Sequence, residues 1–332
     1  MKAIVSFFKK PLRYLVLFLF ALVLFTGYVF LDAFYIERIY AVLLENPVNL
    51  TDIYYIDTEI PRNVTFINRD DSDRSGYDAH GEEEIYVRPG ILVATHVDDN
   101  VNLTIEQFEG VGGYFYVAEV KLSSVNFLRT ALHNGMLGRN ITAPVSVIAE
   151  DNNALFAING DYAGFNDYGV IMRNGQILRM APRQDDQYGL VIDIHGDLLL
   201  FPEEELSEEK LREVFAVNAF SLGPTLIVDG EISISEPPVS VNRSPRTAIG
   251  QKGPLHYIFI VTDGRREGGF DGMEFPELAA EFAKRGVITA YNLDGGGTST
   301  MWFNGELVNT PSSARMIVRE RNTSDIVFIP RS

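Results

Sequence analysis

Residues 291–301 read Tyr-Asn-Leu-Asp-Gly-Gly-Gly-Thr-Ser-Thr-Met, which places one acid, Asp294, between an apolar run and three consecutive glycines. Glycine adopts positive φ and has no side chain in the way, so backbone N–H groups in such a loop can approach phosphate or sugar oxygens. The hydroxyls that follow add adjustable donors. The stretch suits an anion site. A tight hairpin loop, in which Asp294 bonds to its own backbone, explains it equally well.

Two other apolar runs are followed by a similar pattern, in which an aspartate lies next to a glycine. Residues 155–158 lead into the sequence Asn-Gly-Asp-Tyr at 159–162, and residues 257–262 lead into Asp-Gly-Arg at 263–265. Sheet strands are rigid, and the loops at their ends often carry functional groups. Residues 243–250 add Arg243 and Arg246, whose planar guanidinium groups suit phosphate or carboxylate. In an acidic chain, Arg246 and Arg265 would equally serve as ion-pair partners.

The pattern of apolar residues predicts a β-rich α+β domain from about residue 84 to the C-terminus. Short β-branched or alternating runs predict strands at 114–120, 145–149, 155–159, 198–201 and 226–228. Helical periodicity predicts helices at 207–215 and 275–285, the second framed by Pro276 and Gly286. A further short helical stretch is expected at 36–44.

Residues 14–31 carry no charge and are long enough to cross a bilayer as a helix. Four basic residues precede them, which predicts a cytoplasmic N-terminus, a single-pass cell-membrane anchor and an extracytoplasmic C-terminal domain. A cleaved signal peptide is the alternative, but a small-x-small cleavage pattern is missing. The formal net charge is −17, and the part beyond residue 31 is more acidic still. Such a domain is a poor candidate for binding nucleic acid or lipid headgroups.

The segment between the anchor and the domain carries little recognisable chemistry. Residues 32–61 are interpreted as a stalk, and residues 68–84 as a polar surface loop. The acids of that loop miss the spacing of a calcium-binding loop. The expected organisation is therefore a stub and anchor at 1–31, a stalk and polar loop at 32–83, and the main domain at 84–332.

Four motifs occur in a fixed order: residues 159–162, 246–250, 263–265 and 292–301. In that order they resemble the phosphodiester glycosidase family, which includes N-acetylglucosamine-1-phosphodiester alpha-N-acetylglucosaminidase and bacterial proteins associated with exopolysaccharides. The likeness runs from about residue 114 to the end. This chain departs from the family at Asp161, where many relatives have an aromatic residue directly after the glycine. The resemblance implies a β-rich mixed-sheet domain of that family's fold.

The resemblance also implies a reaction, hydrolysis of a sugar-1-phosphodiester such as a GlcNAc-1-phosphodiester at its glycosidic bond. A carboxylate is needed near the oxocarbenium-like centre, as nucleophile or as base. Asp294 is the first choice and Asp263 the second. Phosphate departs with negative charge, so donors around it matter more than a strong acid. The expected substrate-binding residues are Asn159, Gly160, Asp161, Tyr162, Arg246, Thr247, Arg265, Asn292, Gly295, Gly296, Gly297, Thr298 and Ser299. Among them, Arg246, Arg265 and the glycine amides would hold phosphate, the two asparagines sugar hydroxyls, and Tyr162 the sugar ring.

No cofactor is required by this chemistry. The five histidines are isolated, and the chain has no cysteine. Aspartates at strand ends would still suit a divalent cation, so the metal ligands stay unknown. The expected partners are a phosphorylated glycan or sugar-phosphate polymer, and the membrane through the N-terminal helix. Two alternatives stay open, namely a noncatalytic module that binds phosphorylated glycan and a metal-dependent phosphodiesterase.

Overall fold

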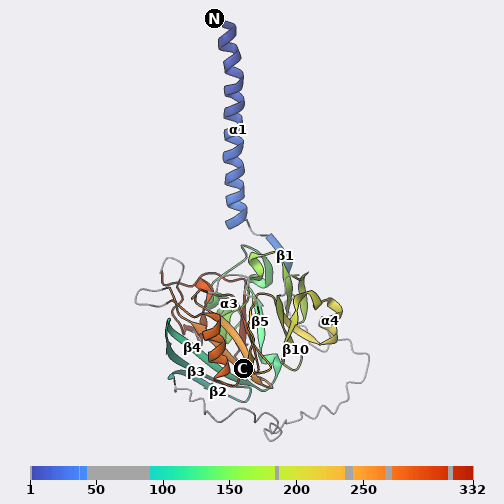
Figure 1. Ribbon diagram of the computed structural model, residues 1–332, viewed down its shortest axis with the longest axis vertical. Helices are drawn as coiled ribbons and strands as arrows, with labels where there is room; N and C mark the ends of the chain where they lie inside the picture. Colours follow the sequence, from blue (N-terminus) through green and yellow to red (C-terminus); the bar gives the residue numbers. More distant parts are fainter. Residues whose placement is uncertain are drawn as a thin grey trace.

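A long apolar helix leads directly into a domain built from antiparallel sheets (Figure 1). The computed structural model describes residues 2–36, 38–42, 90–183, 187–235, 242–265, 271–312 and 317–331. The predicted polar loop at 68–84 and most of the predicted stalk lie outside these residues. The predicted β-rich α+β class is confirmed. The described strand pairs are all antiparallel, so on this point the expectation of mixed sheets is corrected.

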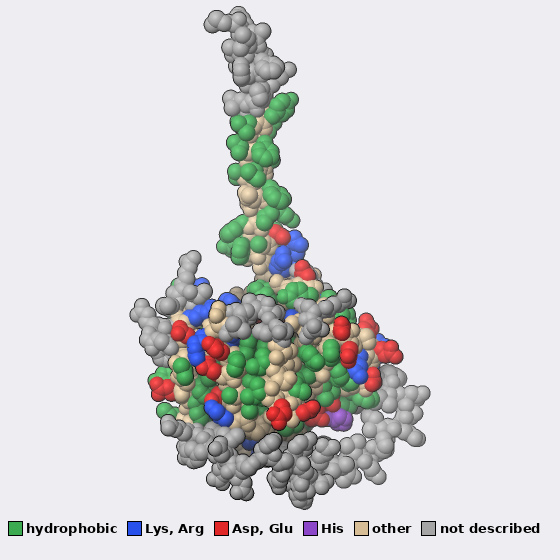
Figure 2. All heavy atoms as spheres, in the orientation of Figure 1, with side chains coloured by type: hydrophobic (Ala, Val, Ile, Leu, Met, Phe, Trp, Pro, Cys, Tyr) green, Lys and Arg blue, Asp and Glu red, His purple; other side chains and the backbone are tan. Residues whose placement is uncertain are grey.

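The helix α1 (Lys2–Phe34) contains an apolar span, Tyr14–Phe34, with a mean hydropathy of 2.5. None of that span is buried against the domain. Figure 2 shows hydrophobic side chains all along its visible face. A helix that is apolar all round and is not buried in the protein is typical of a membrane span, and a signal sequence shares these properties.

Three larger sheets and one two-stranded ribbon make up the domain as far as its residues are described. The eight-stranded sheet has the order β14 (Glu231–Ile232), β13 (Thr225–Val228), β17 (Thr289–Asn292), β15 (Thr247–Gly253), β16 (His256–Thr262), β4 (Gly113–Leu122), β3 (Val101–Gly110) and β2 (Ile91–Val97). One five-stranded sheet has the order β19 (Glu306–Leu307), β18 (Met301–Phe303), β7 (Ala154–Asn159), β20 (Asp325–Pro330) and β5 (Arg129–Leu132). The other has the order β11 (Leu198–Pro202), β10 (Tyr188–Asp193), β12 (Ala216–Phe220), β8 (Gly169–Arg173) and β9 (Gln176–Ala181). The ribbon pairs β1 (Arg38–Val42) with β6 (Met136–Arg139).

In the described part of the chain, three short helices cover the outer faces of the sheets. They are α3 (Val145–Asp151), α4 (Glu208–Glu213) and α5 (Phe275–Ala283). Single 3₁₀ turns connect strands at η2 (Val125–Phe127), η3 (His133–Gly135), η4 (Ala163–Phe165), η5 (Glu203–Glu205) and η6 (Gly296–Thr298). The helices α4 and α5 confirm the predictions for 207–215 and 275–285. Ser207 caps α4 by accepting from the Lys210 amide, and a Glu274–Glu277 capping box starts α5.

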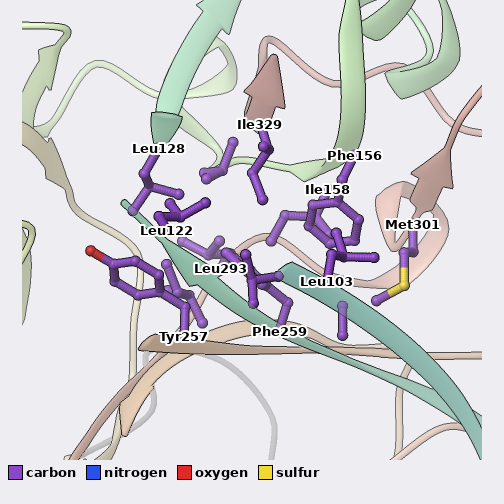
Figure 3. Close-up of a cluster of buried hydrophobic side chains, with 14 of the residues drawn as sticks. Leu103, Leu122, Leu128, Phe156, Ile158, Tyr257, Phe259, Leu293, Met301 and Ile329 are labelled. Atoms are coloured by element: carbon purple, nitrogen blue, oxygen red, sulfur yellow. The ribbon is translucent and has the colours of Figure 1, made fainter. Parts of the chain in front are cut away.

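The main core lies where the eight-stranded sheet faces the two five-stranded sheets. Figure 3 shows Leu103 and Phe259 of the large sheet packing against Phe156, Ile158 and Ile329 of the sheet that contains β7. A second cluster joins the other face of the large sheet to α5 through Leu278 and Phe282. A third seats α3 on the β7–β20 sheet. The result is a sheet sandwich with a helix on each outer face.

Two sequence-based predictions of secondary structure are wrong. Residues 145–149, expected as a strand, form the helix α3, because Val145, Ile148 and Ala149 bury one face at helical spacing after Pro144. The β-branched residues there suggested a strand, but packing decides. The described part of 36–44, expected as a helix, forms β1, since its backbone pairs with β6.

Candidate functional site

A pocket of about 550 Å³ opens where the ends of β15 and β17 meet the turn that follows β7. The strand register brings these segments together, because Ala248 pairs with Asn292 and the Leu293 amide donates to the Thr247 carbonyl. The Asp294 amide then donates to the Gly160 carbonyl, which links the two sheets. The described lining is Tyr162, Tyr168, Arg183, Leu222, Gly223, Asn242, Arg243, Ser244, Arg246, Arg265, Phe275, Asn292, Leu293, Asp294, Gly295, Gly296 and Arg321.

Asp294 is the one carboxylate in this described lining. Its Oδ1 accepts the Gly295 amide at 2.8 Å, and its Oδ2 accepts the Thr298 hydroxyl at 2.7 Å. Burial raises the pKa of Asp294, while the Arg321 guanidinium, the Thr298 hydroxyl and the Gly295 amide oppose that rise. A buried carboxylate with a raised pKa is a stronger base than a free one, which suits proton transfer.

Arg321 is a site residue that the sequence motifs did not identify. Its Nη2 lies 3.3 Å from Asp294 Oδ2 and donates to the Gly295 carbonyl at 3.1 Å. The Arg321 amide also donates to the Gly297 carbonyl at 3.0 Å, so this segment is fixed to the glycine loop. The surrounding sequence, Arg-Glu-Arg-Asn at 319–322, resembles an ordinary polar surface stretch, and only the fold brings it to Asp294.

Arg246 is held in the pocket wall without a carboxylate partner among the described residues. Its Nε donates to the Met273 carbonyl at 3.1 Å, and one Nη donates to the Asn242 carbonyl at 2.8 Å. Its guanidinium carbon lies 3.8 Å from the centre of the Phe275 ring. Burial and then the Arg265 charge lower the pKa of Arg246 to about 10. A buried cation in this state is stabilised by any anion that enters.

Arg265 faces the same pocket from the end of β16. Its Nη2 donates to the Ser244 hydroxyl at 3.1 Å. A Cβ built at Gly296 would lie 3.5 Å from its terminal nitrogens, an ordinary van der Waals separation, so the guanidinium lies directly against the loop. Neither Arg246 nor Arg265 forms an ion pair with a described carboxylate, so the predicted alternative of plain ion pairing finds no support there.

The pocket is therefore strongly cationic although the chain is acidic. Its described lining holds five arginines and a single acid, Asp294. Arg183 and Arg243 are neutralised by Glu203 and Glu277, and Arg321 by Asp294. Among the described residues, Arg246 and Arg265 have no neutralising carboxylate and remain as net positive charge. Such a lining favours a ligand with at least one negative charge, as a phosphodiester has.

Tyr162 and Asn292 reach the pocket as predicted. The Tyr162 ring stacks on Phe165 with centroids 4.7 Å apart, and burial followed by the Asp294 charge raises the pKa of its phenol. Asn292 Nδ2 donates to the carbonyls of Gly223 and Leu293, which leaves its buried Oδ1 without a protein partner. That oxygen is the part of Asn292 that remains for a ligand donor.

The predicted amide cradle of the glycine loop is wrong for two of its three members. The Gly295 amide donates to Asp294 Oδ1, and the Gly296 amide donates to the Pro245 carbonyl at 2.8 Å. Neither N–H is therefore free for phosphate. The glycine at 295 is needed for close approach instead, because a Cβ there would lie 2.7 Å from the Pro245 carbonyl oxygen. Gly297 does not line the pocket.

Asn159, Gly160 and Thr247 support the site from behind rather than line it. Asn159 Nδ2 donates to the Asp294 carbonyl at 2.6 Å, and its Oδ1 accepts the Thr247 hydroxyl at 2.7 Å and the Thr300 amide. The Asn159 side chain therefore has no capacity left for a sugar, contrary to prediction. Gly160 is required because a Cβ there would lie 2.4 Å from the Asp325 carboxylate.

Thr298 and Ser299 are buried behind Asp294 and do not line the pocket either. The Thr298 hydroxyl donates to Asp294 Oδ2 or to the Gly295 carbonyl, so it orients the carboxylate. The Ser299 carbonyl accepts the Asn309 amide group at 3.0 Å, which fixes the chain leading to β18. These two residues act through Asp294 and the loop.

The other two strand-end aspartates point away from the pocket. Asp263 Oδ1 accepts the Thr310 amide at 2.8 Å, and its carboxylate is buried outside the described lining. Asp161 accepts the Ala163 and Ser221 amides and lies 3.1 Å from Arg173. Arg173 in turn contacts Asp325 at 2.8 Å. The structure thus brings neither predicted carboxylate, Asp263 or Asp161, to the substrate space.

A divalent cation finds little to bind in this pocket. The described residues hold no group of three His, Cys, Asp or Glu side chains suited to a metal. Within the described lining a single carboxylate faces several guanidinium groups, and these repel a cation. This donor set does not fit a resident metal.

Comparison with known proteins agrees with these features. The family model described as phosphodiester glycosidase matches residues 152–329, which include every motif around the pocket. The chain is 38% identical over 69 residues to the bovine N-acetylglucosamine-1-phosphodiester alpha-N-acetylglucosaminidase and 39% identical over 69 residues to the human one. It is 30% identical over 122 residues to the SPbeta prophage-derived uncharacterized protein YomE of Bacillus subtilis. The matched segments span only 13%, 13% and 18% of these relatives.

A solved structure shares the fold. The zebrafish N-acetylglucosamine-1-phosphodiester alpha-N-acetylglucosaminidase catalytic domain, auto-inhibited by its pro-peptide, superposes with a TM-score of 0.54 at 22% identity. The match covers 74% of this chain and 89% of that domain. At this identity the likeness establishes the fold alone.

Proposed function

Because this chain belongs to the phosphodiester glycosidase family, we propose that it hydrolyses the glycosidic bond of a sugar-1-phosphodiester, releasing free sugar and a phosphomonoester. The observation that carries the proposal is the buried carboxylate of Asp294, which shares the described pocket lining with five arginines. The reaction needs cationic groups to bind the phosphodiester and a carboxylate near the anomeric carbon, and this pocket offers both.

The arginines suit the phosphate side of the substrate. Arg246 and Arg265 have no described carboxylate partner, so their charge is free to bind a phosphodiester oxygen. When the C–O bond breaks, the bond electrons stay on the phosphate oxygen and its negative charge grows. Donors that are already in position stabilise that growth without reorganising.

Asp294 suits the sugar side. Water attacks the anomeric carbon, its proton passes to Asp294, and the phosphate leaves with the electron pair of the C–O bond. Burial raises the pKa of Asp294, which makes the ionised carboxylate a better proton acceptor at neutral pH. The Tyr162 ring, stacked on Phe165, offers an apolar face for the sugar.

We further propose that α1 stays in the membrane as an anchor with the domain outside the cytoplasm, where the substrate is a phosphorylated glycan or surface polymer. The basic residues before the apolar span support this orientation. Protease accessibility of the domain in intact cells, compared with permeabilised cells, tests it.

The decisive experiment uses the full chain in detergent, a methyl GlcNAc-1-phosphodiester and water enriched in oxygen-18. The proposal expects free sugar that carries the label, because the C–O bond is broken. Asp294→Asn should abolish turnover. Asp229→Asn is the matched control, since Asp229 is an exposed aspartate with φ +51°, a conformation that asparagine tolerates.

Other outcomes identify the two competing functions. Label in the phosphate, with activity lost to EDTA and restored by a divalent ion, would indicate a metal-dependent phosphodiesterase. Binding of the compound without turnover, unchanged in Asp294→Asn, would indicate a noncatalytic module that binds phosphorylated glycan.

A further inference from the structure

The end of the apolar helix is bonded to the domain rather than joined to it by a loose linker. Asp32, in the last turns of α1, pairs with Arg38, and its other oxygen lies 3.7 Å from Arg139. Asn140 Nδ2 donates to the Ile36 carbonyl at 2.8 Å. These contacts join the helix end to the C-terminal end of β6, which belongs to the domain.

The strand after the helix strengthens this attachment. β1 pairs with β6 from Arg38 opposite Arg139 to Val42 opposite Met136. The two backbones approach so closely that a Cβ at Gly138 would lie 2.0 Å from the Arg38 carbonyl oxygen. Figure 1 shows β1 entering the domain directly below α1. The domain is therefore held at one orientation to the helix.

The same strand β6 lies against the pocket rim. A Cβ at Gly164, in η4, would lie 3.1 Å from the Gly138 carbonyl oxygen. The turn η4 follows directly on Tyr162, which lines the pocket. The Gly164 amide donates to the Ser324 hydroxyl, three residues after Arg321 on the other side of the rim. Helix end, β6, η4 and rim thus form one continuous series of contacts.

This series limits how far the pocket lies from the bilayer. From Ile36 the series runs in four steps through Asn140, Gly138 and Gly164 to Tyr162. The first step is a hydrogen bond, the third is a close backbone approach, and the other two are each two residues of chain. At roughly 5–7 Å per step the rim is at most about 28 Å from the helix end. The headgroup layer takes up about 5–8 Å of that distance. The remainder, at most about 20–23 Å, keeps the pocket close to the headgroup layer, where the phosphodiester of a lipid-linked sugar lies.

We propose that the substrate is a sugar-1-phosphodiester carried by a lipid of the same membrane, rather than a freely diffusing glycan. The inference rests on the proposed function and on α1 remaining in the bilayer. Confinement to one membrane raises the local concentration of such a substrate at a pocket held near that surface. The domain surface as a whole is acidic and does not attract headgroups, so the cationic pocket selects the phosphodiester locally.

The test uses the full chain in lipid nanodiscs and two substrates with one GlcNAc-1-phosphoryl head, attached either to a methyl group in solution or to a long isoprenoid chain in the same disc. The first variant inserts twenty Gly/Ser residues after Ile36. Its matched control inserts the same residues after Gly230, in an exposed turn far from the anchor in sequence. A second variant, Arg139→Gln, loosens the attachment without lengthening it.

We expect the unaltered chain to release sugar from the lipid substrate at least tenfold faster than from the methyl compound at equal total concentration. The insertion after Ile36 should remove most of that preference and leave the rate on the methyl compound unchanged, and Arg139→Gln should reduce it severalfold. Equal rates on both substrates, or a preference that survives the insertion, would overturn the inference while leaving the proposed function intact. Release from neither substrate would overturn the proposed function, and the inference with it.

Discussion

Replacing Arg321 by glutamine should move the acid limb of the pH profile to higher pH. Arg321 Nη2 lies 3.3 Å from Asp294 Oδ2, and its charge lowers the pKa that burial raises. Glutamine keeps much of the length and a hydrogen-bond donor but removes the charge. Because the ionised form of Asp294 is the active base, kcat/KM should rise with pH through the pKa of Asp294, and loss of the guanidinium should raise that pKa further.

The size of the shift follows from the geometry. Unit charges at this separation interact by roughly 1 kcal/mol in water and by roughly 4–5 kcal/mol at an effective dielectric constant of 20. The Arg321 side chain is 45% exposed, so solvent screening brings the interaction to about 1 kcal/mol. Since about 1.4 kcal/mol corresponds to one pKa unit, the acid limb should move up by about 0.7 pH unit.

The assay is kcat/KM on the methyl GlcNAc-1-phosphodiester between pH 3.5 and 8, which reports ionisations of the free enzyme. Arg319→Gln is the control, because Arg319 is exposed, lies two residues away and does not line the pocket. Arg321→Gln should also lower kcat/KM at its plateau, since one positive charge of the pocket lining is lost. The position of the limb is the diagnostic quantity. An unmoved limb in a folded Arg321→Gln protein would refute the assignment of Asp294 as the base.

Three further changes test the site from other directions. Asp263→Asn should lower the free energy of unfolding by about 1–3 kcal/mol, because the buried hydrogen bond from the Thr310 amide is weakened. The variant should keep most of its activity per folded molecule. Complete loss of activity in a stable variant would restore Asp263 as a catalytic group. Gly295→Ala should lower Tm by several degrees and reduce kcat, since its Cβ would lie 2.7 Å from the Pro245 carbonyl oxygen. Gly253→Ala is the control, because a Cβ there has open space around it, and it should change neither Tm nor kcat. Burial raises the pKa of Asp325 to about 7, so the folded state binds more protons than the unfolded state between about pH 4 and 7. Urea titrations should therefore show the free energy of unfolding declining as the pH rises through this range. Asp325→Asn should flatten the slope, and an unchanged slope would contradict the raised pKa of Asp325.

The segments that build the site were predictable because each one adjoins a buried strand. Asp294 follows β17 and Arg246 precedes β15, and adjacent antiparallel strands bring such ends to one edge of a sheet. Arg265 comes from the loop after β16, the other neighbour of β15. The motif order therefore contained enough information to bring these three side chains together.

The roles within those segments were less predictable, since a side chain's direction depends on contacts that a motif does not contain. Asn159 faces the Asp294 backbone and Asp263 faces the Thr310 amide, although Asn159 ends a strand as Asn292 does and Asp263 directly follows one. The glycine amides were expected to face phosphate, but bonds to Asp294 Oδ1 and to the Pro245 carbonyl occupy two of them. Arg321 belongs to a segment without a motif, and it reaches the site only because the chain folds back before β20.

The pairing of β1 with β6 has a practical consequence for making the protein without its helix. A truncation that starts at residue 84, where the apolar pattern of the domain begins, would remove Arg38–Val42 and leave β6 as an uncovered strand edge. The fully buried Leu137 and its neighbour Ala41 belong to one apolar cluster, so the truncation would expose part of that cluster to solvent. Such edges promote self-association. A secreted version that begins at or before Asp32 should stay monodisperse where the shorter one forms aggregates.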